Sequence, residues 1–172
     1  HAPAAVAAMK AGLHVITEKL MAHSVHECKE MARVAKKTGL HLATGHQRHY
    51  SILYDNAVDV IKHGLLGDLH YGEVDYYHGI GPWYGQFRWN VLRKAGGSSL
   101  LSAGCHALDA LLLCMGGDVV EVASYSTGSR HRAFRAYEYP TTSTTILKFR
   151  GGAVGKVASS IATSTGRPRP VR

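Results

Sequence analysis

Residues 96–117 form a nearly continuous apolar stretch with a glycine pair at each end. Ser98 or Ser99 can cap a helix that starts after the first pair, and Gly116-Gly117 can end it. Because nearly every residue between the two pairs is apolar, the predicted helix must be buried on most of its sides. The rest of the chain therefore has to supply a packed core around this helix.

Four polar side chains interrupt the apolar helix at spacings of three, four and three, namely Ser99, Ser102, His106 and Asp109. These spacings predict one polar stripe along one helix face. An imidazole and a carboxylate are costly to bury unless they have partners. One interpretation is a structural pair of satisfied core groups. The other is a functional site, which requires a second polar cluster directed at the same place.

The composition is that of a globular protein, with 45% hydrophobic and 19% charged residues among 172. The net charge of +8 is uneven, because arginines crowd residues 130–135 and 167–172. A nucleic-acid-binding face would interleave its basic residues with aromatic ones, so we expect no nucleic-acid partner. We also expect no membrane partner, since we find neither a spanning apolar run nor a signal peptide.

The cysteines and histidines provide no clear metal or disulfide pattern. Cys105 and Cys114 would lie about 13 Å apart along one helix, too far for a disulfide, and Cys28 leaves an odd number. Reduced thiols favour a cytoplasmic location. The histidine pairs at 23/26 and 46/49 have a spacing that suits a metal ion on a helix, but neither has a convincing third ligand. We predict no metal site.

Residues 1–44 alternate between helix and strand. A helix is predicted over residues 4–11, a strand over 13–17, a second helix from a Ser24/Glu27 capping box to Gly39, and a second strand over 40–44. Such alternation indicates a parallel sheet of the doubly wound type, in which ligands bind at the carboxyl ends of the strands. Those ends are residues 18–19 and 45–48.

The remainder indicates an α+β domain with a largely antiparallel open sheet. A helix is predicted over residues 51–63 and a strand-like segment over 69–78. Three β-rich runs follow the central helix, at residues 119–127, 141–149 and 153–161, and a glycine turn joins the last two. The predicted domains are therefore 1–45, the C-terminal half of a nucleotide-binding domain, and 46–172, a substrate-binding and oligomerisation domain.

Three segments together resemble the Gfo/Idh/MocA family, the relatives of glucose–fructose oxidoreductase and inositol dehydrogenase. They are Ala-Gly-Leu-His-Val-Ile-Thr-Glu-Lys at 11–19, Gly-His-Gln-Arg at 45–48, and Gly-Gly leading to Gly-Cys-His-Ala-Leu-Asp at 96–109. The resemblance implies an N-terminal Rossmann domain and a C-terminal α/β domain. It also implies that the chain starts inside the Rossmann domain, whose glycine fingerprint would precede residue 1, and that more sheet would follow residue 162.

The resemblance also implies roles for individual residues. His106 matches the catalytic histidine of the family, and Lys19 the lysine of its Glu-Lys-Pro motif, with Leu20 in place of proline. Ser102 stands where many members carry an aspartate, and a serine cannot hold a proton as a carboxylate can. The expected site comprises catalytic Lys19 and His106, cofactor-binding Glu18, Lys19, Gln47 and Arg48, and substrate-binding Trp83, Trp89, Ser102 and Asp109.

The activity implied is hydride transfer between NAD or NADP and a hydroxyl of a sugar or cyclitol, by an enzyme that forms a homo-oligomer through its open sheet. A neutral imidazole suits the removal of the hydroxyl proton near neutral pH. Two alternatives remain open: an NAD-dependent glycosidase of the same fold, and a non-catalytic binding or scaffold paralogue. Because the glycine fingerprint is missing, we expect the 172-residue chain alone neither to bind NAD(P) nor to catalyse.

Overall fold

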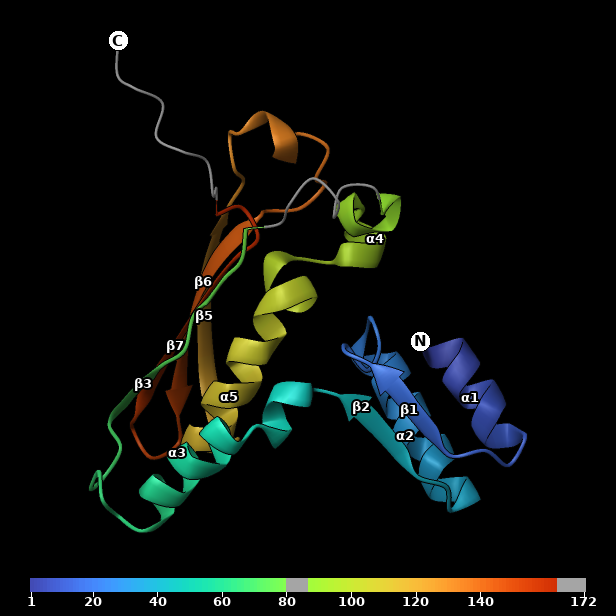
Figure 1. The fold of residues 1–172 in the computed structure, drawn as a ribbon, viewed down its shortest axis with the longest axis horizontal. Helices are drawn as coiled ribbons and strands as arrows, with labels where there is room; N and C mark the ends of the chain where they lie inside the picture. The colour runs from blue at the N-terminus through green and yellow to red at the C-terminus, as the bar shows by residue number, and fades with distance from the viewer. Residues whose placement is uncertain (80–86, 164–172) are drawn as a thin grey trace. The chain divides into compact units, whose positions relative to one another are not determined.

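The computed structural model describes residues 1–79 and 87–163, and the chain divides into two compact units, residues 1–51 and 52–172. The first unit contains α1 (Ala2–Lys10), β1 (Val15–Glu18), α2 (Val25–Thr38), β2 (Leu42–Gly45) and the 3-10 turn η1 (Gln47–Tyr50), as Figure 1 shows. The two strands pair in parallel, with Val15 opposite Leu42 and Glu18 opposite Gly45. The predicted α/β alternation is confirmed.

Helix α2 starts and ends where the sequence predicts. Ser24 Oγ accepts a hydrogen bond from the Glu27 N–H at 3.2 Å, and the Glu27 carboxylate accepts one from the Ser24 N–H at 3.1 Å. The Ser24 hydroxyl holds the pKa of Glu27 below its ordinary value. Gly39 ends the helix with a φ of 70°, a conformation that glycine adopts without steric cost.

The core of the first unit lies on one face of its two strands. Met9 of α1 and Met31 and Val34 of α2 are buried, and Val15 and Leu42 pack against this cluster. On the opposite face Ile16 is 85% exposed. Both faces of a parallel sheet are normally covered, so the exposure of Ile16 in this unit departs from the usual arrangement.

The second unit is built on a five-stranded mixed sheet in the order β3-β7-β6-β5, with β4 also paired to β7. Its elements are α3 (Ile52–Lys62), β3 (Tyr71–Glu73), β4 (Tyr76–Tyr77), η3 (Arg88–Val91), α4 (Arg93–Gly96), the π-helical turn η4 (Leu100–Gly104), α5 (Cys105–Met115), β5 (Val119–Thr127), η5 (Arg132–Phe134), β6 (Thr142–Phe149) and β7 (Val154–Ser160). Strands β5, β6 and β7 are antiparallel, which confirms the three predicted β-rich runs. Strands β3 and β4 both run parallel to β7.

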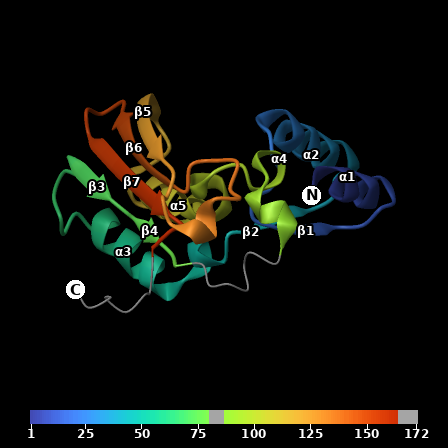
Figure 2. The ribbon, with the colours of Figure 1, turned by 90° about the horizontal axis from the view of Figure 1, so that it is seen from above.

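Helix α5 packs closely on one face of this sheet (Figure 2). Ala107 and Leu111 are buried against Leu147, Phe149 and Val157 of the strands. Two strand glycines make this approach possible. A Cβ added to Gly155 would lie 2.9 Å from Leu111, and one added to Gly72 would lie 2.8 Å from the Met115 sulfur. The helix therefore sits nearer to β3 and β7 than ordinary side chains would permit.

The predicted single helix over 96–117 differs at its start. The chain forms the short α4, turns at Gly97 with a φ of 75°, passes through the π turn η4 and becomes α-helical only at Cys105. Ser98, rather than Ser99, supports the start, because its Oγ accepts a hydrogen bond from the Leu101 N–H at 3.1 Å. A π turn is wider than an α turn, so the predicted polar stripe is no longer straight.

The sequence analysis found no apolar run of membrane-spanning length, whereas the structure contains a candidate by length and composition, Arg93–Met115. In the part of the chain that the structure describes, it alone meets the length and composition of a membrane span, with 23 residues and an 18-residue window of mean hydropathy 1.4. A core helix of a folded domain meets the same test. Because α5 packs its Ala107 and Leu111 onto the sheet, the run acts here as a core helix.

The predicted strand over 69–78 is split into β3 and β4, and Asp75 fills the break. Its Oδ1 accepts a hydrogen bond from the Ala158 N–H at 2.7 Å, in place of a backbone carbonyl. Lys156 Nζ lies 2.7 Å from Asp75 Oδ2 and 2.7 Å from Glu73 Oε1. Burial raises the pKa of Asp75, but the hydrogen bonds from Lys156 and Ala158 outweigh it, and the pKa lies below its ordinary value.

We expect Asp75→Asn to lower the free energy of unfolding of the second unit by about 1–3 kcal/mol at pH 7, the usual loss for a hydrogen bond to a charged group. The folded-state pKa of Asp75 is lowered, so its contribution is present above the unfolded-state pKa of about 4. It is lost as the pH falls through the folded-state pKa. Denaturant unfolding followed by tryptophan fluorescence measures this, since both tryptophans lie in this unit.

Asp118→Asn is the matched control, because Asp118 pairs with Arg150 at 3.1 Å where both side chains are more than 70% exposed. Such an exposed pair contributes at most about 0.5–1 kcal/mol. Equal losses for the two variants, or a loss for Asp75→Asn that is undiminished at pH 3, would contradict this account of the break.

Candidate functional site

The carboxyl ends of β1 and β2 meet at one edge of the first unit. Glu18 stands opposite Gly45, so the segments that follow the two strands begin side by side. A Cβ added to Gly45 would lie 3.2 Å from the Thr17 carbonyl oxygen and 3.9 Å from the Lys19 nitrogen. Gly45 therefore lets the second strand end directly against the Glu18-Lys19 bend.

The four predicted cofactor residues follow these strand ends. Glu18 is exposed and its Oε2 accepts a hydrogen bond from the Lys19 N–H at 3.1 Å. Lys19 is half-buried, and the peptide bond that joins it to Leu20 is cis. Gln47 and Arg48 are exposed in η1, two and three residues beyond Gly45. The structure thus brings this predicted group to one edge of the first unit.

This donor set fits one end of a dinucleotide. Lysine and arginine provide cationic donors, glutamine provides an amide, and a carboxylate can accept hydrogen bonds from ribose hydroxyls. The group lies at the carboxyl ends of β1 and β2, the edge at which ligands bind in other open α/β sheets. The residues present therefore fit NAD or NADP.

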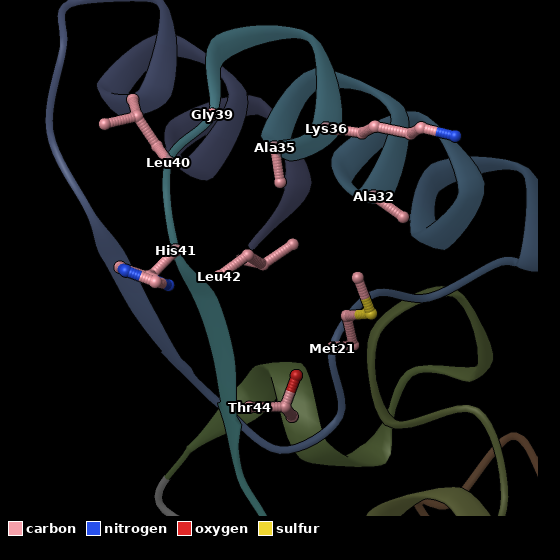
Figure 3. A pocket seen from close by; sticks show the side chains of 9 residues that line it. All are labelled: Met21, Ala32, Ala35, Lys36, Gly39, Leu40, His41, Leu42 and Thr44. Carbon is pink, nitrogen blue, oxygen red and sulfur yellow. The ribbon is translucent and has the colours of Figure 1, made fainter.

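The hollows on the first unit lie beside this edge group rather than within it. One, of about 530 Å³, is bounded by α2, β2 and Met21, and Figure 3 shows Ala32, Ala35, Leu42 and Met21 pointing into it. None of the predicted site residues lines this hollow. A second hollow, between α1 and β1, includes Glu18 at its margin. Both are open to solvent, so neither by itself defines a site.

His106 is the buried titratable group of the central helix in the second unit. It lies in the first turn of α5 and is 5% exposed. Its ring centroid lies 5.9 Å from that of Tyr76 on β4, with the two planes tilted by 34°. Ser102, in the π turn, and Asp109, one turn further along α5, are half-buried. These three predicted residues therefore lie on consecutive turns of one helical run.

Ser99 departs from the predicted stripe and faces the sheet. It is fully buried, and its Oγ lies 3.0 Å from Ser159 Oγ on β7 and 3.3 Å from Ser143 Oγ on β6. Sequence reasoning missed Ser143 and Ser159. The signal was present, since both are polar at positions of β6 and β7 where strand alternation predicts an inward, apolar residue.

Trp89 is exposed, whereas Trp83 lies outside the described residues. The Trp89 side chain, in η3, is 55% exposed, and its ring centroid lies 6.5 Å from that of Phe87. An indole this exposed does not anchor a loop in the core. The adjacent Asn90 does so instead, because its backbone carbonyl accepts a 2.6 Å hydrogen bond from the buried Tyr139 hydroxyl.

Residues 1–79 and 87–163 contain no group of three or more histidine, cysteine, aspartate or glutamate side chains that could hold a metal ion. Cys28, Cys105 and Cys114 are free thiols.

Comparison with known proteins connects both units to one family. Residues 1–46 match the oxidoreductase family with the NAD-binding Rossmann fold, and residues 54–171 match the GFO/IDH/MocA C-terminal domain. Among solved structures, the aldose–aldose oxidoreductase from Caulobacter crescentus, complexed with glycerol, superposes with a TM-score of 0.85 at 26% identity. That match covers 95% of this chain and 48% of the Caulobacter chain.

Two curated relatives show how far the likeness extends. The 1-carboxy-3-chloro-3,4-dihydroxycyclohexa-1,5-diene dehydrogenase of Comamonas testosteroni is 30% identical over 166 residues, which is 93% of this chain and 39% of that protein. The α-N-acetylgalactosaminidase of Tannerella forsythia is 36% identical over 81 residues, 46% of this chain and 17% of that protein. The chain thus spans less than half the length of these relatives, and it belongs to the GFO/IDH/MocA family of oxidoreductases.

Proposed function

We propose that the chain is part of an NAD(P)-dependent oxidoreductase that transfers hydride between the nicotinamide and a hydroxyl-bearing carbon of a sugar or cyclitol. The observation that carries this proposal is the buried histidine, His106, on an otherwise apolar helix of the second unit. The strand-end group of the first unit, Glu18 to Arg48, supports it separately. Family membership supports the same chemistry, since its N-terminal match is to an NAD-binding fold.

In this proposal His106 is the general base. Hydride leaves a carbinol carbon readily only as the hydroxyl proton is removed, and a neutral imidazole accepts protons near neutral pH. The nicotinamide supplies the hydride acceptor, and the protein supplies orientation and proton transfer. Lys19, as an ammonium, polarises the substrate oxygen or stabilises its developing negative charge. Glu18, Gln47 and Arg48 hold the cofactor.

Four further residues are proposed to contact the substrate. Trp89, exposed beside Phe87, offers an aromatic face on which the C–H groups of a sugar ring can pack. Trp83 is proposed to contribute a second indole. Ser102 and Asp109 lie one turn to either side of His106 and offer a hydroxyl and a carboxylate to substrate hydroxyls. A serine at 102 cannot take up the proton as a carboxylate would, so the proposal assigns that role to His106.

The glycosidase alternative has weaker support. The Tannerella relative covers 46% of this chain, whereas the Comamonas dehydrogenase covers 93%. A non-catalytic paralogue would retain the fold without turnover. Turnover of sugars or polyols by the full-length protein separates such a paralogue from an oxidoreductase.

We further propose that the intact protein is a cytoplasmic homo-oligomer whose subunits meet through the sheet face opposite α5. Tyr125 of β5, Ile146 of β6 and Tyr77 of β4 lie on that face and are 86%, 41% and 60% exposed. Apolar and aromatic side chains gathered on one sheet face are typical of a subunit interface. The three free thiols fit a reducing cytoplasm.

We expect His106→Ala in the full-length protein to lower kcat by roughly 10²–10⁴-fold, the usual range for a lost general base. Cofactor affinity should change little, because His106 is not among the cofactor-binding residues. Reduction of NAD⁺ or NADP⁺, followed at 340 nm across a panel of sugars and polyols, measures this. The exposed His63 provides the control variant His63→Ala, and unchanged turnover in His106→Ala would remove His106 from the mechanism.

A valine at position 45 is expected to weaken NAD(P)H binding by at least about tenfold. Its Cβ would press on the Thr17 carbonyl at 3.2 Å and its methyl groups on the Glu18-Lys19 bend, which displaces the proposed cofactor residues. Titration of the full-length protein by cofactor fluorescence measures the affinity. Ala43→Val adds comparable bulk to the same strand at an exposed position, and a similar loss in both variants would disprove the role given to Gly45.

The interface proposal predicts that Ile146→Glu dissociates the full-length protein into smaller species. A carboxylate on the sheet face would have to be buried without a partner in the oligomer. Sedimentation velocity at micromolar concentration measures the mass. Ile52→Glu, which places the same charge at a 72% exposed position of α3, should leave the mass unchanged. A monomeric wild type, or an Ile146→Glu variant of unchanged mass, would rule out this interface.

A further inference from the structure

The serine group formed by Ser99, Ser143 and Ser159 is buried where the central helix begins. Ser159 Oγ donates a hydrogen bond to Ser99 Oγ at 3.0 Å, and Ser143 Oγ lies 3.0 Å from Ser159 Oγ. Ser99 and Ser159 have no exposed surface, and Ser143 is 9% exposed. The three buried hydroxyls are thus hydrogen-bonding partners of one another. They connect the start of the helical run to both β6 and β7.

Ser159 also lies directly beneath the end of the π turn. A Cβ added to Gly104 would lie 2.4 Å from Ser159 Cβ, so the helix backbone rests on this one side chain. The run η4–α5 therefore contacts β7 at two residues, Ser99 and Gly104. Ser102 lies between these two residues, and His106 follows two residues after Gly104. The π turn lacks the regular hydrogen-bond pattern of an α-helix, so its position relative to the sheet depends on these two contacts.

The same serine aligns the other neighbour of the histidine. In the ladder between β4 and β7, Tyr76 stands opposite Ser159. Tyr76 is the residue whose ring lies 5.9 Å from that of His106. Ser159 thus connects both the helix that carries His106 and the strand whose tyrosine packs beside its ring.

We infer that Ser159, through Ser99 and Gly104, is a positioning residue that sets the location of the His106 imidazole. This inference rests on the proposed function insofar as His106 is the base. A hydroxyl at 159 is small enough to lie under Gly104 and polar enough to hold Ser99. A displacement of about 1 Å at a reacting group can cost on the order of a hundredfold in rate, so the contact has a catalytic consequence.

The test compares Ser159→Ala with Thr145→Val in the full-length protein. Thr145 is a buried sheet residue whose Oγ1 lies 2.9 Å from Ser124 Oγ on β5, so its isosteric variant removes a buried hydroxyl that is bonded to another strand. We expect Ser159→Ala to lower kcat roughly ten- to a hundredfold, with the KM for the cofactor unchanged. Thr145→Val should lose comparable thermal stability and retain its kcat.

A double variant tests whether the two hydroxyls act together. Ser99→Ala should lower kcat as Ser159→Ala does, and the combination should lower it no further than either single change, because either change already breaks the Ser159–Ser99 hydrogen bond. Equal falls in kcat for Ser159→Ala and Thr145→Val, or strictly multiplicative effects of Ser99→Ala and Ser159→Ala, would overturn the inference.

A second readout does not depend on turnover. In histidine-labelled protein, the imidazole NMR signal absent from His106→Asn identifies His106. This signal and its titration midpoint should shift in Ser159→Ala and stay in place in Thr145→Val. If the wild type oxidises no sugar or polyol but this shift occurs, the proposed function fails and the positioning stands. An unshifted His106 signal in Ser159→Ala overturns the positioning whatever the activity.

Discussion

The close contact between the central helix and strand β7 is the constraint on which the second unit depends. Gly104 packs directly on Ser159. Leu111 packs on Gly155 so closely that a Cβ at position 155 would clash with it. Dense packing leaves no room for the helix to slide, since interiors are packed as tightly as organic crystals. A group on the helix, such as His106, therefore has a location set by the sheet beneath it.

The same contact explains the irregular start of the helix. A regular α-helix beginning at Ser98 would keep Ser99 and His106 on one face, whereas the π turn directs Ser99 into the sheet. The hydroxyl gains two buried partners, and His106 remains next to Tyr76. A local departure from ideal helix geometry is thus offset by hydrogen bonds to β6 and β7. Such π turns occur often at functional sites.

Much of the fold was predictable because the signals for it are local. The Ser24/Glu27 capping box defined the start of α2, and alternating residues defined β5, β6 and β7. The π turn, the break at Asp75 and the parallel pairing of β3 with β7 were not predictable. Each depends on a residue more than 50 positions away, namely Ser159, Ala158 and Gly155, and no local pattern reports such a contact.

The residues of the candidate site also fall into those that local patterns predict and those that depend on distant contacts. Glu18, Lys19, Gln47 and Arg48 follow from the rule that parallel strands end together, and the strand register confirms that their segments meet. The polar spacing on the helix identified His106 but assigned Ser99 to the wrong face, because spacing alone assumes an α-helix throughout. Ser143 and Ser159 were missed although both are polar at inward strand positions, because nothing local connects either of them to Ser99, 44 and 60 residues away.

The central claim is that this chain contributes the cofactor edge and the base of an alcohol-oxidising enzyme. Isotope transfer tests it most directly. The full-length protein would be incubated with NAD⁺ or NADP⁺ and polyols or sugars deuterated at the carbinol carbons, and the reduced cofactor analysed by mass spectrometry. The account predicts deuterium at C4 of the nicotinamide in stoichiometric yield with oxidised product. Tight cofactor binding with no deuterium transfer from any such substrate, or glycoside cleavage without net cofactor reduction, would contradict it.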